Sequence, residues 1–454
     1  MNIIVSGCGK IGSTIVESLV LEGHDVTVLD MNPAVVEEIT NIHDVMGVCG
    51  NCTDCETLKD ARVADARVFV AVTGSDELNM LACFLAKRMG ARHTIARIRN
   101  PEYNQSSLVF LRQQLDLSMA INPELLAAQE LYNILKFPSA VKIETFSRRD
   151  FEMIEVRLKP DSVLNGMNLI TMREKYDAKV LVCAVQRDNE VFIPDGNFVI
   201  KGGDKLGITA TPTEFLKFFK ALSVYQKQAK DIMILGGSRI AYYLAQMLVR
   251  GGSNVKIIDR DAEVCQRFCD DIPKATVIVG DGAQQELLLE EGIKDTEAFV
   301  SLTGMDEQNI LISVFASSLN VPKVISKVNR DELFNLAENL GLDTIVSPKK
   351  ITSDVLLRYV RALSNSFGSN VETLYHLMDD KAEAIEFRVS PEFEWVNIPL
   401  KDLQMKKNII IAGIIRERKP MIPTGNDCIM ANDRVIVIAA GQRLQELSDI
   451  IKKG

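Results

Sequence analysis

The segment Asn2-Ile3-Ile4-Val5-Ser6-Gly7-Cys8-Gly9-Lys10-Ile11-Gly12 decides the fold of this chain. Residues 2–6 are apolar and predict a short buried strand, and the three glycines predict a turn that opens a helix. A second apolar strand, residues 26–29, ends at Asp30, 23 residues after Gly7. A strand, a G-x-G-x-x-G turn, a helix and an acid at this distance form the fingerprint of a dinucleotide-binding Rossmann unit.

Each position of the fingerprint has a physical reason. Gly7 permits the tight turn, Gly9 lets the backbone approach a pyrophosphate, and Gly12 lets helix and strand pack closely. The N–H groups at the helix N-terminus favour phosphate. Asp30 is expected to accept hydrogen bonds from ribose hydroxyls, which favours NAD(H) or an adenosine nucleotide over NADP(H). The expected phosphate loop is Gly7, Cys8, Gly9, Lys10, Ile11 and Gly12.

Further apolar strands are predicted at residues 44–49, 68–72 and 94–98, alternating with helices. This order predicts a doubly wound parallel sheet, in which ligands bind beyond the carboxyl ends of the strands. The residues at or near those ends are candidate nucleotide contacts, with the alternative that any one is only a turn or surface residue: Asn51, Cys52, Thr73, Gly74 and Arg97.

The whole pattern occurs twice. Gly7 corresponds to Gly236 and Asp30 to Asp259, and offsets of 229 or 230 continue to the C-terminus. The prediction is an α/β protein with two tandem Rossmann-like units, each followed by a small α+β domain. The expected limits are 1–137 and 230–366 for the Rossmann-like units, and 138–226 and 367–454 for the small domains.

The second copy is altered at its fingerprint, where Ser238 and Ala241 replace the second and third glycines. Alanine is tolerated there, but Ser238 adds a side chain where the backbone should meet phosphate. A second site with weaker affinity or a different nucleotide is therefore expected. Its candidate residues are Gly236, Gly237, Ser238, Arg239, Ile240, Asp259, Asp281, Thr303, Gly304 and Lys327.

The small domain of the first copy is predicted to hold strands at residues 153–158, 179–185, 192–196 and 205–209, a helix near 169–173 and a terminal helix. The second copy is expected to repeat this order, with Asp433 opening its last strand. The first of these regions contains no sequence cluster of histidine, acid and nucleophile, and no catalytic residue is expected in the chain.

Composition narrows the functional classes. The 454 residues carry a formal net charge of −9, which argues against nucleic acid as the main partner. No apolar run approaches the ~20 residues of a membrane-spanning helix, and the N-terminus lacks the features of a signal peptide. An odd number of cysteines, nine, fits reduced thiols and a cytoplasmic protein.

Cys49, Cys52 and Cys55 have the two-residue spacing of metal sites. The second copy replaces all three by other residue types in the same turn, and no fourth ligand pair is near. No metal site is therefore expected, and redox sensitivity at a nucleotide pocket that also holds Cys8 stays an alternative.

The paired fingerprints, the Thr-Gly-Ser-Asp-Glu-x-Asn segment at residues 73–79 with its echo at 303–309, the Ile-Ala-Arg-Ile-Arg strand at 95–99 and the Ile-Pro-x-Gly turns give the chain a resemblance to a known family. It resembles the TrkA family of RCK (KTN) regulatory proteins over nearly its whole length. The resemblance implies binding of NAD(H) or ATP/ADP and a homo-oligomeric ring, expected as a tetramer of chains. It also implies a peripheral position at the inner face of the cell membrane, where the ring gates a potassium-conducting subunit of the TrkH or TrkG type.

In related regulators an acid after the last strand of the Rossmann-like unit contacts phosphates through a cation or reaches a neighbouring subunit. Glu124 fits that pattern, whereas the second copy carries Lys349 there, which favours direct contact with phosphate. Both residues have the alternative of simply starting a solvated helix.

Two other functional classes stay open. One is an NAD-dependent oxidoreductase, although the four histidines occupy isolated positions that do not indicate a proton donor. The other is a nucleotide-sensing module with no channel partner.

Overall fold

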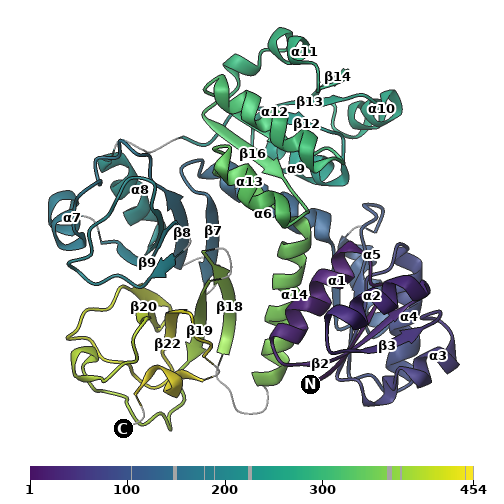
Figure 1. The fold of residues 1–454 in the computed structure, drawn as a ribbon, viewed down its shortest axis with the longest axis horizontal. Helices are drawn as coiled ribbons and strands as arrows, with labels where there is room; N and C mark the ends of the chain where they lie inside the picture. The colour runs from purple at the N-terminus through teal and green to yellow at the C-terminus, as the bar shows by residue number, and fades with distance from the viewer. Residues whose placement is uncertain are drawn as a thin grey trace.

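The computed structural model describes residues 1–103, 105–146, 151–177, 179–188, 190–222, 227–365, 371–378, 381–444 and 446–452. Four sheets form four domains, two Rossmann-like units and two small domains (Figure 1). The predicted limits at residues 226, 366, 367 and 454 lie outside the described residues. No helix within the described residues is long and apolar enough to cross a membrane.

The first Rossmann-like unit has a six-stranded parallel sheet of order β3-β2-β1-β4-β5-β6. Its central strand β4 is buried throughout, as expected of a sheet covered by helices on both faces. The strands are β1 Asn2–Ser6, β2 Asp25–Asp30, β3 Met46–Cys49, β4 Val68–Ala71, β5 His93–Arg97 and β6 Met119–Ile121. The helices are α1 Lys10–Leu21, α2 Pro33–Ile42, α3 Cys55–Asp60, α4 Asp76–Arg88, α5 Gln105–Gln114 and α6 Pro123–Lys136.

The second Rossmann-like unit repeats this sheet in the order β14-β13-β12-β15-β16-β17. Its strands are β12 Asp231–Leu235, β13 Asn254–Asp259, β14 Thr276–Val279, β15 Ala298–Ser301, β16 Lys323–Lys327 and β17 Ile345–Val346. Its helices are α9 Arg239–Arg250, α10 Ala262–Asp271, α11 Gln285–Glu290, α12 Asp306–Ser318, α13 Glu332–Asn339 and α14 Pro348–Asn365. The predicted fold class is confirmed.

Each small domain is a five-stranded antiparallel sheet. The first has the order β10-β9-β11-β8-β7, with β7 Lys142–Phe146, β8 Phe151–Arg157, β9 Leu181–Arg187, β10 Glu190–Phe192, β11 Lys205–Ala210 and helices α7 Leu169–Tyr176 and α8 Pro212–Ala221. The second has the order β18-β19-β22-β20-β21, with β18 Val371–Leu377, β19 Ala382–Arg388, β20 Ile409–Arg416, β21 Lys419–Met421 and β22 Arg434–Ala440.

The structure corrects several sequence predictions about these domains. The second small domain repeats the strands but not the helices, because the described residues form only the 3-10 turns Leu400–Asp402 and Leu447–Ile450 there. In α8, Phe215, Phe218 and Phe219 are fully buried, and the shorter second turn has no aromatic residue to bury. The strand predicted at 44–49 starts only at Met46, the one at 179–185 starts at Leu181, and the one at 192–196 keeps only Phe192.

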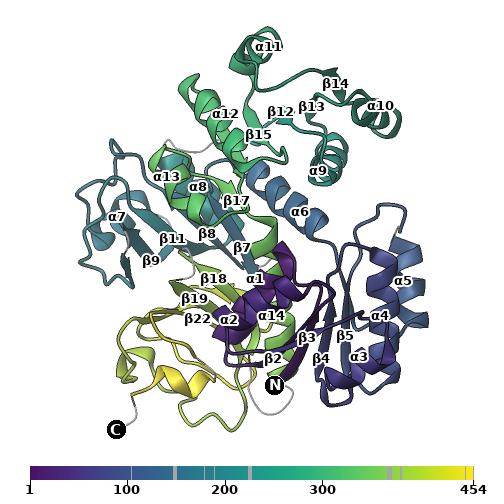
Figure 2. The same cartoon turned by 45° about the vertical axis from the view of Figure 1, so that its right-hand side comes forward.

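The two Rossmann-like units exchange their last helices. Helix α6, which ends the first unit, packs on α9 of the second unit, and α14, which ends the second, packs on α1 of the first (Figure 2). The shared cores contain Ala127, Ala128 and Leu131 with Leu244, Ala245 and Leu248, and Leu356, Leu357 and Val360 with Ile15, Val16 and Leu19. The units are therefore held face to face by two reciprocal helix contacts.

The two small domains also pack on each other. Phe146, Phe151 and Met153 of the first share a buried cluster with Ala384, Ile436 and Ile438 of the second. A hydrogen bond from Thr209 Oγ1 to the carbonyl of Ala412, 3.3 Å long, crosses the same contact. Each half of the chain thus contacts the other half through both of its domains.

Candidate functional site

The glycine turn of the first copy has little room for side chains except at one position. Gly7 has a φ of +87°, and a Cβ there would lie 2.6 Å from the backbone nitrogen of Thr73. A Cβ on Gly12 would lie 2.0 Å from the carbonyl oxygen of Gly7. A Cβ on Gly9 would meet nothing within 4 Å. The backbone at Gly9 therefore faces open space, where a pyrophosphate can approach it.

Helix α1 begins without a side-chain cap at Gly9. The first N–H groups of a helix have no partner inside the helix. These donors and the positive end of the helix dipole are therefore available to a phosphate at this N-terminus.

Asp30 connects the end of β2 to the glycine turn. One carboxylate oxygen accepts a hydrogen bond from the N–H of Cys8 at 2.7 Å, and the other accepts one from the N–H of Asn32 at 2.9 Å. The carboxylate thus holds the loop in shape, and each of its oxygens keeps capacity to accept a further hydrogen bond.

A cavity of about 710 Å³ opens at the carboxyl ends of these strands. Its volume lies within the range of small-molecule and cofactor sites. Of the candidate residues of the first copy, those that line it are Gly7, Gly9, Lys10, Ile11, Asp30, Cys52, Thr73, Gly74, Arg97 and Glu124. The cavity is also lined by residues of the second copy, Ile240, Asn329, Lys327 and Lys349.

The remaining candidates of the first copy have other surroundings. Cys8 is buried, with its thiol 3.6 Å from the carbonyl oxygen of Val5. Gly12 packs against Gly7 behind the turn. Asn51 accepts hydrogen bonds from the N–H and hydroxyl of Thr53 and shapes its own loop.

Four cationic side chains line the cavity. Arg97 is 9% exposed and donates a hydrogen bond to the carbonyl of Thr73. Lys327 donates to the carbonyl of Thr303 at 2.5 Å, and Lys349 to Asp331 at 2.8 Å. Burial lowers the pKa of Lys327, Asp306 opposes the shift, and Lys10 adds to it. Cations from both copies thus face the space beside the first helix N-terminus.

Glu124 starts α6 at the same cavity. Its Oε2 is buried and has no hydrogen-bond partner among the described residues. Such an oxygen is costly unless a ligand, a cation or water pairs with it.

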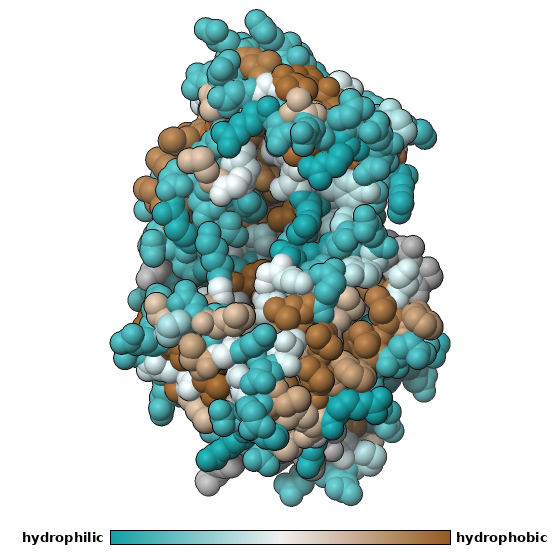
Figure 3. All heavy atoms as spheres, turned by 90° about the vertical axis from the view of Figure 1, so that its right-hand side faces the viewer, coloured by the Kyte–Doolittle hydropathy of each residue, from teal (hydrophilic) through white to brown (hydrophobic). Residues whose placement is uncertain are grey.

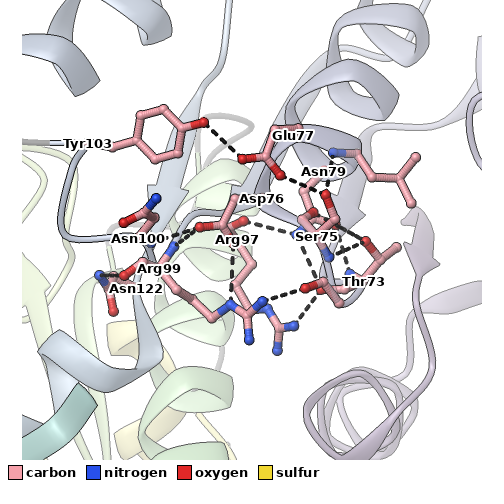
Figure 4. A network of polar contacts seen from close by, with 12 residues as sticks. Thr73, Ser75, Asp76, Glu77, Asn79, Arg97, Arg99, Asn100, Tyr103 and Asn122 are labelled. Atoms are coloured by element: carbon pink, nitrogen blue, oxygen red, sulfur yellow. Dashed lines mark hydrogen bonds and ion pairs between the residues drawn. The ribbon is translucent and has the colours of Figure 1, made fainter. Parts of the chain in front are cut away.

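The Thr-Gly segment is held by a polar network (Figure 4). The amide oxygen of Asn79 accepts from the N–H and hydroxyl of Thr73 at 2.8 and 2.7 Å, and its nitrogen donates to the carbonyl of Arg97 at 2.9 Å. Asp76 accepts the backbone N–H groups of Arg99 and Asn100 at 2.7 and 2.8 Å. Asn309 and Asp306 repeat these bonds in the second copy. The motif thus fixes the loop beside the strand ends.

The second fingerprint has the same fold but different donors. Gly236 has a φ of +97°, and the N–H of Gly237 donates to Asp259 at 2.5 Å, as Cys8 does to Asp30. The hydroxyl of Ser238, however, accepts the N–H of Ala241 at 3.3 Å and caps α9. The second copy therefore satisfies with its own side chain one of the N–H groups that have no side-chain acceptor in the first copy.

Side chains also occupy more of the space around the second turn. A Cβ on Gly237 would lie 2.3 Å from Val264 Cγ1, and one on Gly282 would lie 2.0 Å from Leu235 Cδ1. Asp281 accepts the N–H of Ala283 at 3.0 Å. The second-copy candidates that do not line the cavity are Gly236, Gly237, Ser238, Arg239, Asp259, Asp281, Thr303 and Gly304.

The cysteines of the first copy do not converge. Cys49 and Cys55 are exposed, whereas Cys52 is buried, and the three do not form a potential metal-binding group among the described residues. Burial, with a contribution from Asp30, raises the pKa of Cys8 to about 12, and burial also raises that of Cys52. Both buried thiols are therefore protonated at neutral pH, which makes them poor nucleophiles.

Sequence reasoning missed several lining residues. Met31 directly follows Asp30, and Leu78 is the variable position of the 73–79 segment, so both could have been found from the predicted pattern. Asn329 could not have been found in this way, because the sequence repeat places it in the second copy and not near the first fingerprint. Its place at the first site depends on the exchanged helices.

Comparison with protein families matches both halves of the chain. The TrkA-N domain matches residues 3–123 and 232–348, and the TrkA-C domain matches residues 153–223 and 384–452. The chain is similar to a Trk system potassium uptake protein TrkA homolog of Archaeoglobus fulgidus, with 30% identity over 100% of both chains. It is also similar to Trk system potassium uptake protein TrkA of Haemophilus influenzae, with 31% identity over 99% of this chain and 96% of the relative.

Among solved structures, the GsuK RCK domain matches 97% of this chain and 92% of its own with a TM-score of 0.64 and 18% identity. The GsuK channel bound to NAD matches 97% of this chain and 77% of its own with a TM-score of 0.62 and 17% identity. The GsuK structure bound to ADP matches 80% of this chain and 69% of its own with a TM-score of 0.51 and 16% identity. These likenesses show a shared fold. Because the family domains cover most of both halves, this chain belongs to the TrkA family.

Proposed function

We propose that this chain is a nucleotide-sensing regulatory subunit that gates a potassium-conducting membrane protein of the TrkH or TrkG type. The names of the full-length relatives, Trk system potassium uptake proteins, support the potassium pathway. The observation that carries the proposal is the cavity of the first fingerprint, because residues of both Rossmann-like units line it. A ligand there touches two units at once.

The ligand of this cavity is NAD(H) or ATP/ADP. The open backbone at Gly9, the uncapped N-terminus of α1 and the carboxylate of Asp30 support a nucleotide with a phosphate chain and free ribose hydroxyls. Lys10, Arg97 and Lys327 supply positive charge for the phosphates. The NAD-bound and ADP-bound GsuK structures share the fold and support both ligand classes.

Regulation follows from unequal binding to two arrangements of the units. Lys327 and Lys349 belong to the second copy, so their contact with a phosphate chain changes when the units move relative to each other. A nucleotide then stabilises the arrangement in which it binds more tightly. Glu124, with its unpaired buried oxygen, is the acidic partner for the ligand or for a cation held by the phosphates.

The chain assembles into a ring of identical copies, with a tetramer as the proposed form. Large apolar side chains are exposed on corresponding helices of both units: Leu81, Val109 and Phe110 on α4 and α5, and Leu311 and Leu336 on α12 and α13, with Leu340 directly after α13. Figure 3 shows apolar side chains gathered on the lower half of the face that carries the first unit. A second copy of the chain is the occupant proposed for these helices, since both halves present similar surfaces. The ring is peripheral to the membrane through its partner.

An oxidoreductase is the less supported reading. None of the four histidines lines the cavity, so no histidine proton donor stands beside a bound nicotinamide. An assay of nucleotide consumption separates the two readings, because a sensor leaves NADH and ATP unchanged.

The test of the proposed function is potassium flux through liposomes that contain the membrane subunit. Flux should change when the chain and a nucleotide are added together, and the response should disappear with Gly9→Val. If the chain leaves the flux unchanged in the presence of ATP, ADP, NAD and NADH, the proposed regulatory role is wrong.

A further inference from the structure

A second cavity, of about 590 Å³, lies where the first Rossmann-like unit meets the second small domain. Glu22 follows α1 at one wall, and His376 on β18 and Glu383 on β19 form another. Glu22 belongs to a different domain from His376 and Glu383 and lies more than 350 positions before them in the chain.

The three side chains bring metal-binding atoms together. One ligand atom from each of Glu22, His376 and Glu383 lies within 4.8 Å of the other two. Around a tetrahedral ion with bonds of about 2.0–2.2 Å, neighbouring ligand atoms stand about 3.3–3.6 Å apart. Small side-chain rotations therefore suffice to enclose an ion.

Two of the three residues carry a buried polar atom that has no hydrogen-bond partner among the described residues. Glu383 is 7% exposed, and its Oε2 is buried without a hydrogen-bond partner among the described residues. The Nε2 of His376 is also buried without a hydrogen-bond partner among the described residues. Unsatisfied buried polar atoms are costly, and here the two residues that carry them line the same cavity.

Arg361 of α14 orients the carboxylates. It makes two hydrogen bonds to Glu22, of 2.7 and 2.5 Å, and a longer contact of 3.3 Å to Glu383. The longer contact can open while the pair with Glu22 remains. Carboxylates that bind metals commonly accept such outer hydrogen bonds.

We propose that Glu22, His376 and Glu383 bind one divalent transition-metal ion of the zinc class. The imidazole nitrogen favours Zn²⁺ and its neighbours in the periodic table over Mg²⁺ or Ca²⁺, which prefer oxygen ligands alone. The open cavity provides the entry path and leaves a fourth position to water. The ion joins the first Rossmann-like unit to the second small domain, at a place separate from the nucleotide cavity.

The chain contains a matched control for this site. The first small domain has the same hairpin, with Phe146 pairing Phe151 as Leu377 pairs Ala382. By this register Glu152 corresponds to Glu383, whereas Thr145 stands where the second domain has His376. The first hairpin therefore lacks the nitrogen ligand, and Glu152→Gln should leave metal binding unchanged.

The test is a Co²⁺ titration of the full-length chain without nucleotide or histidine tag, followed by displacement with Zn²⁺. The exposed Cys49, Cys55 and Cys269 are replaced by serine to remove other metal ligands. We expect one Co²⁺ per chain, with a visible d–d absorption band. His376→Gln and Glu383→Gln should each weaken binding by at least about 100-fold, more than the loss of an outer partner causes.

Circular dichroism of the metal-free variants checks that they fold. Undiminished Co²⁺ binding in both variants would overturn the proposal, and so would the lack of a one-to-one Co²⁺ complex in the parent. Crystals of the parent soaked with Zn²⁺ give an independent answer that needs no variant. An anomalous peak among the three side chains supports the site, and a peak only elsewhere contradicts it.

Discussion

The two Rossmann-like units share a fold and differ at the atoms that would meet a phosphate. In the first unit Gly9 carries no side chain and α1 begins uncapped. In the second, the Ser238 hydroxyl occupies the same place and accepts the N–H of Ala241. One oxygen atom thus decides whether the helix N-terminus is satisfied by the protein or left for a ligand.

The comparison also shows that the second unit contributes a side chain to the cavity of the first unit. The second unit keeps Lys327, which corresponds to Arg97, but it lines the cavity of the first. A copy with a capped helix can therefore still contribute charge to its neighbour's site. Its own loops are held by the same network, with Asn309 in the place of Asn79.

The largest expected effect comes from Gly12→Ala. The added Cβ would lie 2.0 Å from the Gly7 carbonyl, so the turn or the helix must move. We expect a loss of about 3 kcal/mol of folding stability for the first unit, together with loss of nucleotide binding. Thermal denaturation followed by circular dichroism measures the first, and calorimetry the second.

The second unit supplies the control for that variant, since it carries Ala241 at the same position. Ala241→Gly should cost only about 1 kcal/mol, the price of backbone freedom in a helix. A Gly12→Ala protein that melts like the parent would show that the close packing of the first turn is not needed.

Asp30→Ala should lower nucleotide affinity by about 1–3 kcal/mol, because a charged hydrogen-bond acceptor for the ribose is lost. Asp30 also accepts the N–H groups of Cys8 and Asn32, so a stability loss of about 1 kcal/mol is expected as well. Calorimetry with ATP, ADP, NAD and NADH measures the binding.

Asp259→Ala is the matched variant in the second unit. Asp259 accepts equivalent backbone bonds from Gly237 and Asp261, so the stability loss should be similar. Affinity at the first site should hardly change. If both variants weaken binding equally, the assignment of the ribose to Asp30 is wrong.

Lys327→Gln tests whether the second unit serves the first site. We expect a loss of about 1–2 kcal/mol in nucleotide affinity, since a charge-assisted contact to phosphate disappears while the fold is kept. Lys349→Gln, at another second-copy residue that lines the cavity, serves as a comparison. Unchanged affinity in both would mean that the cavity does not bind its ligand across the two units.

The lowered pKa of Lys327 also predicts that nucleotide affinity depends on pH. Burial lowers its pKa, so the ammonium group loses its proton at a lower pH than an ordinary lysine does. Nucleotide affinity should be fully retained below this lowered pKa and fall as the pH rises through it. The fall should be absent in Lys327→Gln, and a parallel fall in both proteins would assign it to another group.

The smallest effect is expected from Ser238→Gly. Loss of the cap should cost only a few tenths of a kcal/mol, because glycine is itself accepted at this position. The variant frees the N–H of Ala241 for phosphate and should strengthen any nucleotide binding at the second unit. Calorimetry that finds no gain would show that Val264 and Leu235, rather than the cap, close that site.

The two doubly wound parallel sheets and the asymmetry between Gly9 and Ser238 could be predicted from the sequence. Glycines, strands and the acids at 30 and 259 carry a strong local signal. The exchange of α6 and α14 could not, because an apolar helix face does not say which unit will cover it. For the same reason the repeat assigns Lys327 to a second site, whereas the structure brings it to the first cavity.

The sequence also did not predict that the second small domain lacks the helices of the first among its described residues. The strands of the two small domains repeat well, and the expectation of matching helices followed them. Only the three phenylalanines of α8 distinguish the first domain, and they have no counterparts near Leu447–Ile450.

The central claim is that the first fingerprint, and not the second, holds the nucleotide. Calorimetry of the parent, Gly9→Val and Ser238→Val with the same nucleotide tests it most directly. A Cβ at Gly9 would meet nothing within 4 Å, so we expect Gly9→Val to fold normally and yet to block the phosphate. The account predicts one tight site per chain, lost in Gly9→Val and kept in Ser238→Val. Equal losses in the two variants, or a loss only in Ser238→Val, would contradict it.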